Sequence, residues 1–152
     1  MRIALDSNLL IYLARVWKAD GDQRKTAAAE SILLRLPESI IPVVPFQALG
    51  ESYRVMLRYG YNHEKCRATV LEWANRFETV ASSEHAFLSA IDLATDHKLQ
   101  FWDALIINAS ADAGCQMLLS EDLQPGFVWR GLRVVNPFAP ELDQRLSRLL
   151  AD

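Results

Sequence analysis

The sequence predicts an α/β sandwich built on a mostly parallel β-sheet, and two observations support this prediction. Short apolar segments with strand character alternate with longer segments of helical periodicity along the chain. The 152 residues are 51% hydrophobic and 23% charged, which is enough apolar material for one buried core. We therefore expect residues 1–152 to form a single domain.

The expected elements follow from periodicity and from capping residues. Strand character is clearest at residues 3–5, 40–44, 116–119 and 132–135, with a shorter extended segment at 78–81. Pro42 and Pro45 predict that the second of these strands is short or lies at a sheet edge. Helical periodicity is found at residues 9–17, 22–36, 46–59, 62–77, 83–97, 102–113 and 141–150. The helix at 102–113 is apolar on nearly every face, which predicts that it is buried.

Charge and cysteine content narrow the function classes. A net charge of −3 and a pI of about 5.6 argue against a generic basic nucleic-acid binder, but are compatible with a nuclease that has an acidic centre. Cys66 and Cys115 belong to no paired-cysteine motif, so we expect free thiols in a reducing compartment. No apolar run approaches the ~18–20 residues of a membrane span, and no secretory leader is apparent. These features predict a cytoplasmic protein.

Four acidic residues at the joints between apolar segments are the candidate functional residues. Asp6 and Asp122 each follow a strand candidate, Glu51 lies in the helix at 46–59, and Asp103 lies at the start of the buried helix. Ligands of parallel sheets bind beyond the carboxyl ends of the strands, so Asp6 and Asp122 are expected at the same edge. Converging carboxylates repel each other and need a divalent cation. A carboxylate cage that holds Mg²⁺ or Mn²⁺ can hydrolyse phosphodiesters.

Each acid also has a purely structural explanation. Asp6 and Asp103 could cap the helices that follow them, Asp122 could stabilise a turn, and Glu51 could be solvated. Asp103 is the least easily explained in this way, because a charge between Trp102 and an apolar run is costly unless it is paired. The three histidines have polar neighbours typical of solvated helix positions and are not expected to be catalytic: His63, His85 and His97.

Three segments resemble the PIN-domain proteins, and specifically the toxin ribonucleases of the VapC type. The run Ile3–Asn8 is similar to the family's strand that ends in Asp-Thr-Asn, with Ser7 in place of Thr. Phe101–Ala104 resembles its aromatic-Asp-Ala segment. Leu119–Gln124, followed by Gly126 and by Val134–Phe138, is similar to its C-terminal signature, and Glu51 falls at the matching place in an early helix.

The resemblance implies a three-layer α/β/α sandwich and Mg²⁺- or Mn²⁺-dependent endonuclease activity on RNA. Carried over by position, Asp6, Glu51, Asp103 and Asp122 would form the catalytic metal site. Asn8 and Ser120 would not bind the metal directly but would hydrogen-bond to the metal-binding carboxylates or to bound water. A homodimer and an inhibiting antitoxin protein are implied as well. Two alternatives remain: a housekeeping RNA-processing nuclease of the same fold, and a non-catalytic PIN domain that acts as a binding module.

Overall fold

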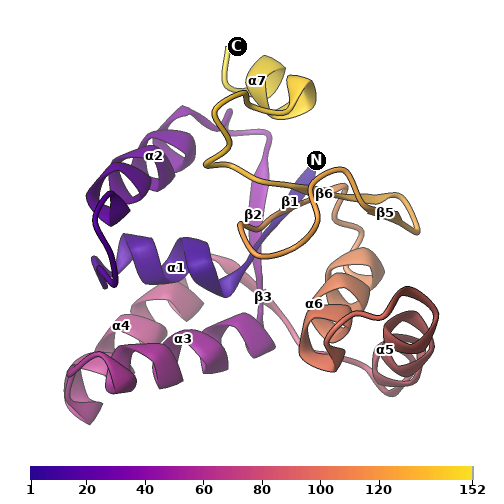
Figure 1. Cartoon of the computed structure of the whole chain (residues 1–152), viewed down its shortest axis with the longest axis horizontal. Helices are drawn as coiled ribbons and strands as arrows, with labels where there is room; N and C mark the ends of the chain where they lie inside the picture. The colour runs from indigo at the N-terminus through magenta and orange to yellow at the C-terminus, as the bar shows by residue number, and fades with distance from the viewer. Residues whose placement is uncertain (152) are drawn as a thin grey trace.

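A mostly parallel sheet forms the centre of the molecule. The computed structural model describes residues 1–151, which contain a six-stranded sheet in the order β3-β2-β1-β4-β6-β5. All neighbouring pairs are parallel except β5 with β6 (Figure 1). This arrangement confirms the predicted α/β class. The strands are β1 (Arg2–Leu5), β2 (Ile41–Pro45), β3 (Glu78–Val80), β4 (Met117–Leu119), β5 (Val128–Trp129) and β6 (Leu132–Val135).

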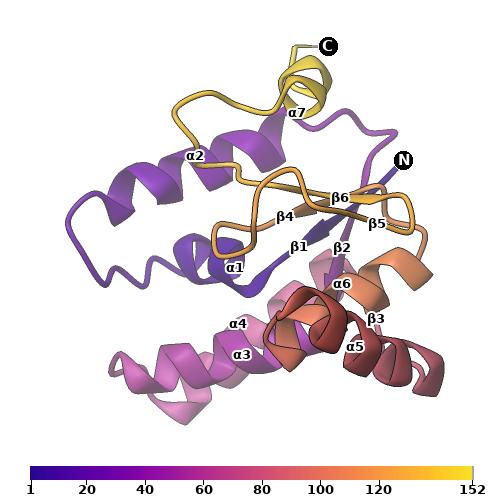
Figure 2. The same ribbon diagram turned by 45° about the vertical axis from the view of Figure 1, so that its right-hand side comes forward.

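Helices cover both faces of the sheet and complete the three-layer sandwich. Parallel strands require right-handed crossovers, which place α1 to α4 on one face and α5 and α6 on the other (Figures 1 and 2). None of the helices in residues 1–151 is long and apolar enough to cross a membrane. The helices are α1 (Ser7–Leu13), α2 (Asp22–Arg35), α3 (Phe46–Arg58), α4 (His63–Arg76), α5 (Glu84–His97), α6 (Phe101–Asp112) and α7 (Gln144–Leu149).

The hydrophobic core fixes the two elements that carry Asp6 and Asp103, which are the end of β1 and the first turn of α6. Ile3, Ala4 and Leu5 of β1 are fully buried, so Asp6 leaves a rigid strand. Helix α6 is buried continuously from Ala104 to Ser110, as its all-round apolar sequence predicts. Burial of such side chains stabilises the fold by roughly 1.5–3 kcal/mol for each large apolar residue. The first turn of α6, which carries Asp103, is thereby anchored against the sheet.

The first helix is shorter than its periodicity predicts. It ends at Leu13, because Arg15 adopts a positive φ of 59° and the Val16 amide turns back to the Ile11 carbonyl at 3.1 Å. Trp17 therefore lies outside the helix, is 45% exposed, and donates its indole N–H to Thr26 Oγ1 at 3.0 Å. Our expectation that the helix continues to residue 17 was wrong, since local backbone reversal overrides the apolar spacing.

Strand β2 is short, as expected, but it does not lie at the edge. It pairs with β1 on one side and β3 on the other. Val43 and Val44 are fully buried there, and this burial outweighs the ladder hydrogen bonds that the two prolines cannot donate. Strand β5, which the sequence did not predict, is a two-residue antiparallel addition to β6. The terminal helix begins later than predicted, with Asp143 as its N-cap.

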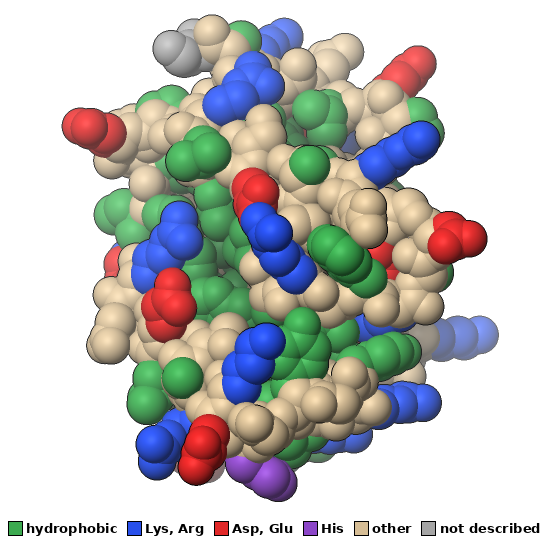
Figure 3. Space-filling view, turned by 90° about the vertical axis from the view of Figure 1, so that its left-hand side faces the viewer, with side chains coloured by type: hydrophobic (Ala, Val, Ile, Leu, Met, Phe, Trp, Pro, Cys, Tyr) green, Lys and Arg blue, Asp and Glu red, His purple; other side chains and the backbone are tan. Residues whose placement is uncertain are grey.

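A groove of about 380 Å³ lies between α1, α2 and α4. Apolar side chains contribute to its lining, including Leu13, Leu33 and Trp73. Leu34 at its margin is 81% exposed. Figure 3 shows this side of the molecule, where apolar side chains gather between charged ones. Exposed apolar surface of this kind is typical of a protein-binding face.

Candidate functional site

Asp6 is the centre of a polar network at the carboxyl edge of the sheet. It follows β1 and caps α1, and one carboxylate oxygen accepts the Ser7 amide at 2.7 Å. The other oxygen accepts the Ser120 hydroxyl at 2.6 Å and the Asn8 side-chain amide at 3.3 Å. Ser120 directly follows β4, the neighbour of β1. Asp6 thus caps a helix and also joins the ends of two adjacent strands, so its structural and functional explanations are compatible.

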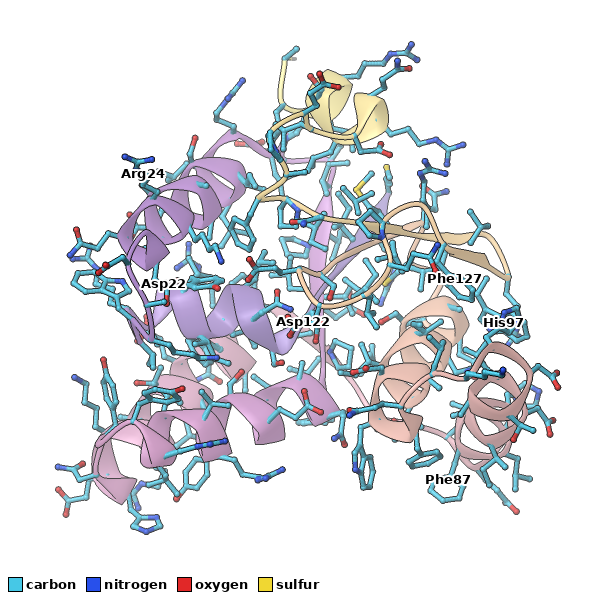
Figure 4. All side chains as sticks on the ribbon, in the orientation of Figure 1. Asp22, Arg24, Phe87, His97, Asp122 and Phe127 are labelled. Carbon is cyan, nitrogen blue, oxygen red and sulfur yellow. The ribbon has the colours of Figure 1, made fainter. Side chains whose placement is uncertain are left out.

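Asn8 connects this network to the acidic loop after β4. Its Nδ2 lies 3.4 Å from Ser120 Oγ and 3.5 Å from an Asp122 carboxylate oxygen, and its Oδ1 accepts the Glu121 amide at 3.3 Å. Asn8 and Ser120 are both buried. Asn8 and Ser120, which we expected to support the carboxylates through hydrogen bonds, therefore both contact Asp6. Asn8 also contacts Asp122. Figure 4 labels Asp122 in the region between α1, α3 and α6.

Two of the four acids, Asp6 and Asp103, have a raised pKa. Burial raises the pKa of Asp6 from 3.8 to about 6, and the Glu51 and Asp103 carboxylates push this pKa in the same direction. Hydrogen bonds from Ser120 and the Ser7 amide oppose the increase. The pKa of Asp103 is also raised, first by burial and then by repulsion from Glu51 and Asp122. Acids from four separate segments therefore act within one electrostatic environment.

The structure excludes helix capping as the explanation for Asp103, and it places the half-buried Glu51 at the edge of a cleft. Glu51 lies on α3, and together with Asp122 it lines a cleft of about 280 Å³ at the carboxyl edge of the sheet. The side chain of Gln47 donates a hydrogen bond to the Glu51 carboxylate at 3.2 Å. Asp103 does not cap α6, since Gln100 is the N-cap. No side chain in residues 1–151 hydrogen-bonds to its carboxylate. Helix α3 turns its Ala48, Ser52 and Met56 side inward and leaves Phe46 52% exposed.

The donor chemistry of this site fits a hard divalent cation. Carboxylate, amide and hydroxyl oxygens are the ligands that Mg²⁺ and Mn²⁺ prefer, and mutual repulsion among carboxylates favours a cation between them. As placed in residues 1–151, however, no three Asp, Glu, His or Cys side chains are close enough together to hold an ion jointly. Binding an ion here requires the half-buried Glu51 and the exposed Asp122 to move toward Asp6 and Asp103.

Glu121, the neighbour of Asp122, is held away from the site by residues that sequence reasoning missed. Lys25 of α2 forms an ion pair with its carboxylate, and the Tyr12 hydroxyl donates to it at 2.7 Å. Lys25 also contacts the Tyr12 hydroxyl at 3.1 Å. Burial and the Glu121 hydrogen bond raise the pKa of Tyr12 to about 12. We call this group of Tyr12, Lys25 and Glu121 the clamp; Glu121 is bound within it, whereas Asp122 lines the cleft. No local sequence pattern predicts the clamp, because Glu121 is far from Tyr12 and Lys25 in the chain.

Lys25→Met is expected to lower the free energy of unfolding by about 1–2 kcal/mol, because it leaves the partly buried Glu121 carboxylate without its charged partner. Urea unfolding at pH 7 measures this change. Lys25→Arg keeps the charge and should lose less, and Arg24→Met removes an exposed cation from the same helix as a control. Equal stability of Lys25→Met and the parent protein would show that the clamp contributes nothing.

The histidines and cysteines are as the sequence predicts. His63, His85 and His97 are exposed, and Cys66 and Cys115 are buried free thiols. Neither group contributes to the acidic site. Trp129 packs against the core and donates its indole N–H to Asn108 at 3.0 Å.

Solved structures with a similar fold include one VapC and two VapBC structures. VapC20 of Mycobacterium tuberculosis, described as a sarcin-ricin loop cleaving toxin, has a TM-score of 0.63 at 17% identity, covering 79% of this chain and 89% of that one. VapBC-1 of nontypeable Haemophilus influenzae has a TM-score of 0.60 at 19% identity, covering 80% and 87%. VapBC2 of Rickettsia felis, bound to a DNA fragment from its promoter, has a TM-score of 0.56 at 15% identity, covering 79% and 86%.

The structural matches are below 20% identity and show only the fold, so the family is taken from comparison of the sequence. A search of curated proteins by sequence found no match. The family model of the PIN domain matches residues 3–125, which include Asp6, Glu51, Asp103 and Asp122. The match covers most of the chain and agrees with the sheet topology and with the resemblance of its sequence segments. This chain therefore belongs to the PIN domain family.

Proposed function

We propose that this protein is a divalent-metal-dependent endoribonuclease of the VapC type, acting as the toxin of a type II toxin–antitoxin pair. The main support is the group of four acids at the carboxyl edge of a PIN-domain sheet, Asp6, Glu51, Asp103 and Asp122. Burial, and after it repulsion from neighbouring acids, raises the pKa of Asp6 and of Asp103 in this group. The VapC and VapBC proteins among the similar structures support the toxin assignment.

Each residue has a distinct task in this proposal. Asp6 and Asp103 would hold a Mg²⁺ or Mn²⁺ ion, and Glu51 and Asp122 would complete the site. A bound divalent cation supplies a water of lowered pKa and offsets the charge that develops on the phosphate. Asn8 and Ser120 keep the Asp6 carboxylate oriented through their hydrogen bonds. Hydrolysis by this route gives products with a 5′-phosphate and a 3′-hydroxyl.

The proposed antitoxin is a small protein that covers the groove between α1, α2 and α4. The apolar lining and the exposed Leu34 offer it a binding surface. An Arg or Lys of such a protein, inserted among the acids, would replace the cation and block activity. Co-purification of the toxin with the product of a neighbouring short gene would test this partner.

A homodimer is part of the same proposal. Helix α5 exposes Phe87, Leu88 and Ile91, which is unusual apolar surface for a helix that needs no partner. Figure 4 labels Phe87 at the lower edge of α5, where its partly exposed ring also contacts Phe101 of α6. The buried free thiols suit a reducing cytosol, in which we place the activity. Sedimentation at increasing protein concentration measures the oligomeric state.

Cleavage of a mixed RNA substrate tests the central proposal. The protein is incubated with RNA in Mg²⁺ or Mn²⁺, and the products are resolved on a sequencing gel and checked for 5′-phosphates. We expect discrete cleavage products that a matched inactive variant does not give. A folded protein that binds a divalent ion and cleaves no RNA from its host would contradict the assignment.

Two alternatives differ in what they predict. A housekeeping RNA-processing nuclease would share the acids and the metal but would lack a neighbouring antitoxin gene, and its expression would not arrest growth. A non-catalytic binding module would bind RNA or protein without cleaving RNA. The complete set of four acids favours an enzyme over this module.

A further inference from the structure

A cleft of about 280 Å³ opens directly beside the acidic site, and its lining is not acidic throughout. The catalytic candidates Glu51 and Asp122 belong to this lining. Three cations and one large aromatic ring line the cleft as well. These are Lys18, Arg54, Arg58 and Trp102. The chain as a whole has a net charge of −3, so three cations gathered beside the acidic site make this surface locally more positive than the rest of the protein.

The two arginines follow from the geometry of α3. Residues 51, 54, 55 and 58 recur at helical spacing, and all four line the cleft, so the proposed catalytic glutamate and both guanidinium groups share one face. From Glu51 to Arg58 the helix rises by ~10 Å. Arg54 and Arg58 therefore extend away from Glu51 along one face of α3.

These cations have no anionic partner within the chain. In residues 1–151, no carboxylate forms an ion pair with Lys18, Arg54 or Arg58, although seven such pairs form elsewhere. Lys18 lies only over the ring of Tyr59, at 5.6 Å from its centroid. Unpaired cations that share a cleft are available to bind an external polyanion.

Trp102 supplies a fixed aromatic surface at the start of α6. It is 52% exposed, although the helix that follows is buried. Its ring makes an edge contact with Phe101 at 4.9 Å between centroids, and Phe101 makes another with Phe87 at 5.1 Å. The ring is thereby held in place by packing while much of its surface faces solvent. Such a ring is a stacking platform for an unpaired base.

We propose that this cleft binds single-stranded RNA next to the scissile phosphate, with Arg54, Arg58 and Lys18 on backbone phosphates and Trp102 stacked on a base. The proposal rests on the proposed ribonuclease function and assigns the residues of this chain that hold the RNA strand beside the acids. The small volume of the cleft and its aromatic platform favour a splayed-out single strand, since the bases of a duplex are already stacked on each other.

The test measures binding separately from cleavage. In an Asp103→Asn background that does not cut, a fluorescent single-stranded RNA is titrated in Mg²⁺ at several NaCl concentrations. The double variant Arg54→Gln/Arg58→Gln is expected to weaken binding and to reduce the slope of log K against log salt by about 1.4, because each phosphate that the protein no longer neutralises accounts for ~0.7. A control variant, Arg24→Gln/Arg67→Gln, removes two exposed arginines that do not line the cleft and should leave this slope unchanged.

The aromatic platform gives a different signature. Trp102→Ala is expected to weaken binding about 10-fold without changing the salt slope, because stacking is not electrostatic. Trp102→Phe should restore most of the affinity. A blunt-ended RNA duplex, which has no unpaired bases, should bind more weakly to the parent protein and should not respond to Trp102→Ala.

The outcomes separate this inference from the proposed function. An unchanged salt slope and affinity in Arg54→Gln/Arg58→Gln would overturn the inference, even if the wild type cleaves RNA. Equal weakening in the control variant would overturn it too, since only net charge would then matter. Weakening confined to the cleft variants supports it, even if the wild type is found to bind RNA without cleaving it.

Discussion

Asp6→Asn and Asp103→Asn are each expected to lower RNA cleavage about 100-fold or more, because each removes a charged oxygen ligand that the proposed metal site needs. Asparagine keeps the size of the side chain and a carbonyl oxygen, so the fold survives. Single-turnover cleavage of an RNA substrate in Mg²⁺ measures the effect, with circular dichroism as the check on folding. Asp96→Asn, an exposed change on α5, is the matched control and should retain full activity.

Asp6→Asn should also stabilise the metal-free protein at neutral pH. The pKa of Asp6 is about 6 in the folded state against 3.8 ordinarily, so between these values the folded state holds a proton that the unfolded chain has lost. The stability that Asp6 contributes therefore falls as the pH rises from about 4 to about 6 and stays low above that. We expect Asp6→Asn to raise the free energy of unfolding by about 1–3 kcal/mol at pH 7, with little gain at pH 4.

Two results would contradict these roles. Retained metal-dependent cleavage in both variants would show that neither carboxylate belongs to the catalytic centre. A stability gain from Asp6→Asn that is the same at pH 4 and pH 7 would show that desolvation of the Asp6 charge is not the cause. Urea unfolding in EDTA at the two pH values distinguishes the second case.

Removal of divalent metal is expected to abolish cleavage and to lower the thermal stability of the protein. If Mg²⁺ is present at about 100 times its Kd, binding to the folded state adds ~2.7 kcal/mol. For a domain of this size that raises Tm by roughly 5–10 °C. Differential scanning fluorimetry across an Mg²⁺ titration measures the shift. The shift should be largely absent in Asp103→Asn, because fewer charged oxygens remain to hold the ion.

Controls separate specific binding from a general salt effect. Sodium chloride at equal ionic strength should not reproduce the Mg²⁺ shift, and adding Mn²⁺ after EDTA should restore cleavage. Full activity in excess EDTA would contradict the metal-dependent mechanism. An Mg²⁺ shift of the same size in Asp103→Asn and wild type would place the ion elsewhere on the protein.

Periodicity and capping predicted most elements because these signals are local. Asn62 and Ser83 cap α4 and α5 by accepting the Lys65 and Ala86 amides, as the sequence indicates. The apolar run after Asp103 forms the buried helix α6. The predictions failed where long-range packing decided the outcome. Trp17 lies outside α1 and donates a hydrogen bond to Thr26. Strand β2 is short, as its prolines predict, and only the fold shows that it pairs with a neighbour on each side.

The sequence by itself determined the α/β class and identified Asp6, Glu51, Asp103 and Asp122 as candidates, because residue type and position relative to apolar segments are local properties. Only the tertiary structure decided that Ser120 and Asn8 bond to Asp6, that Lys25 and Tyr12 hold Glu121 aside, and that Arg54 and Arg58 share a cleft with Trp102. These contacts join residues up to 114 positions apart. Their formation depends on strand order and helix packing, which no local pattern encodes.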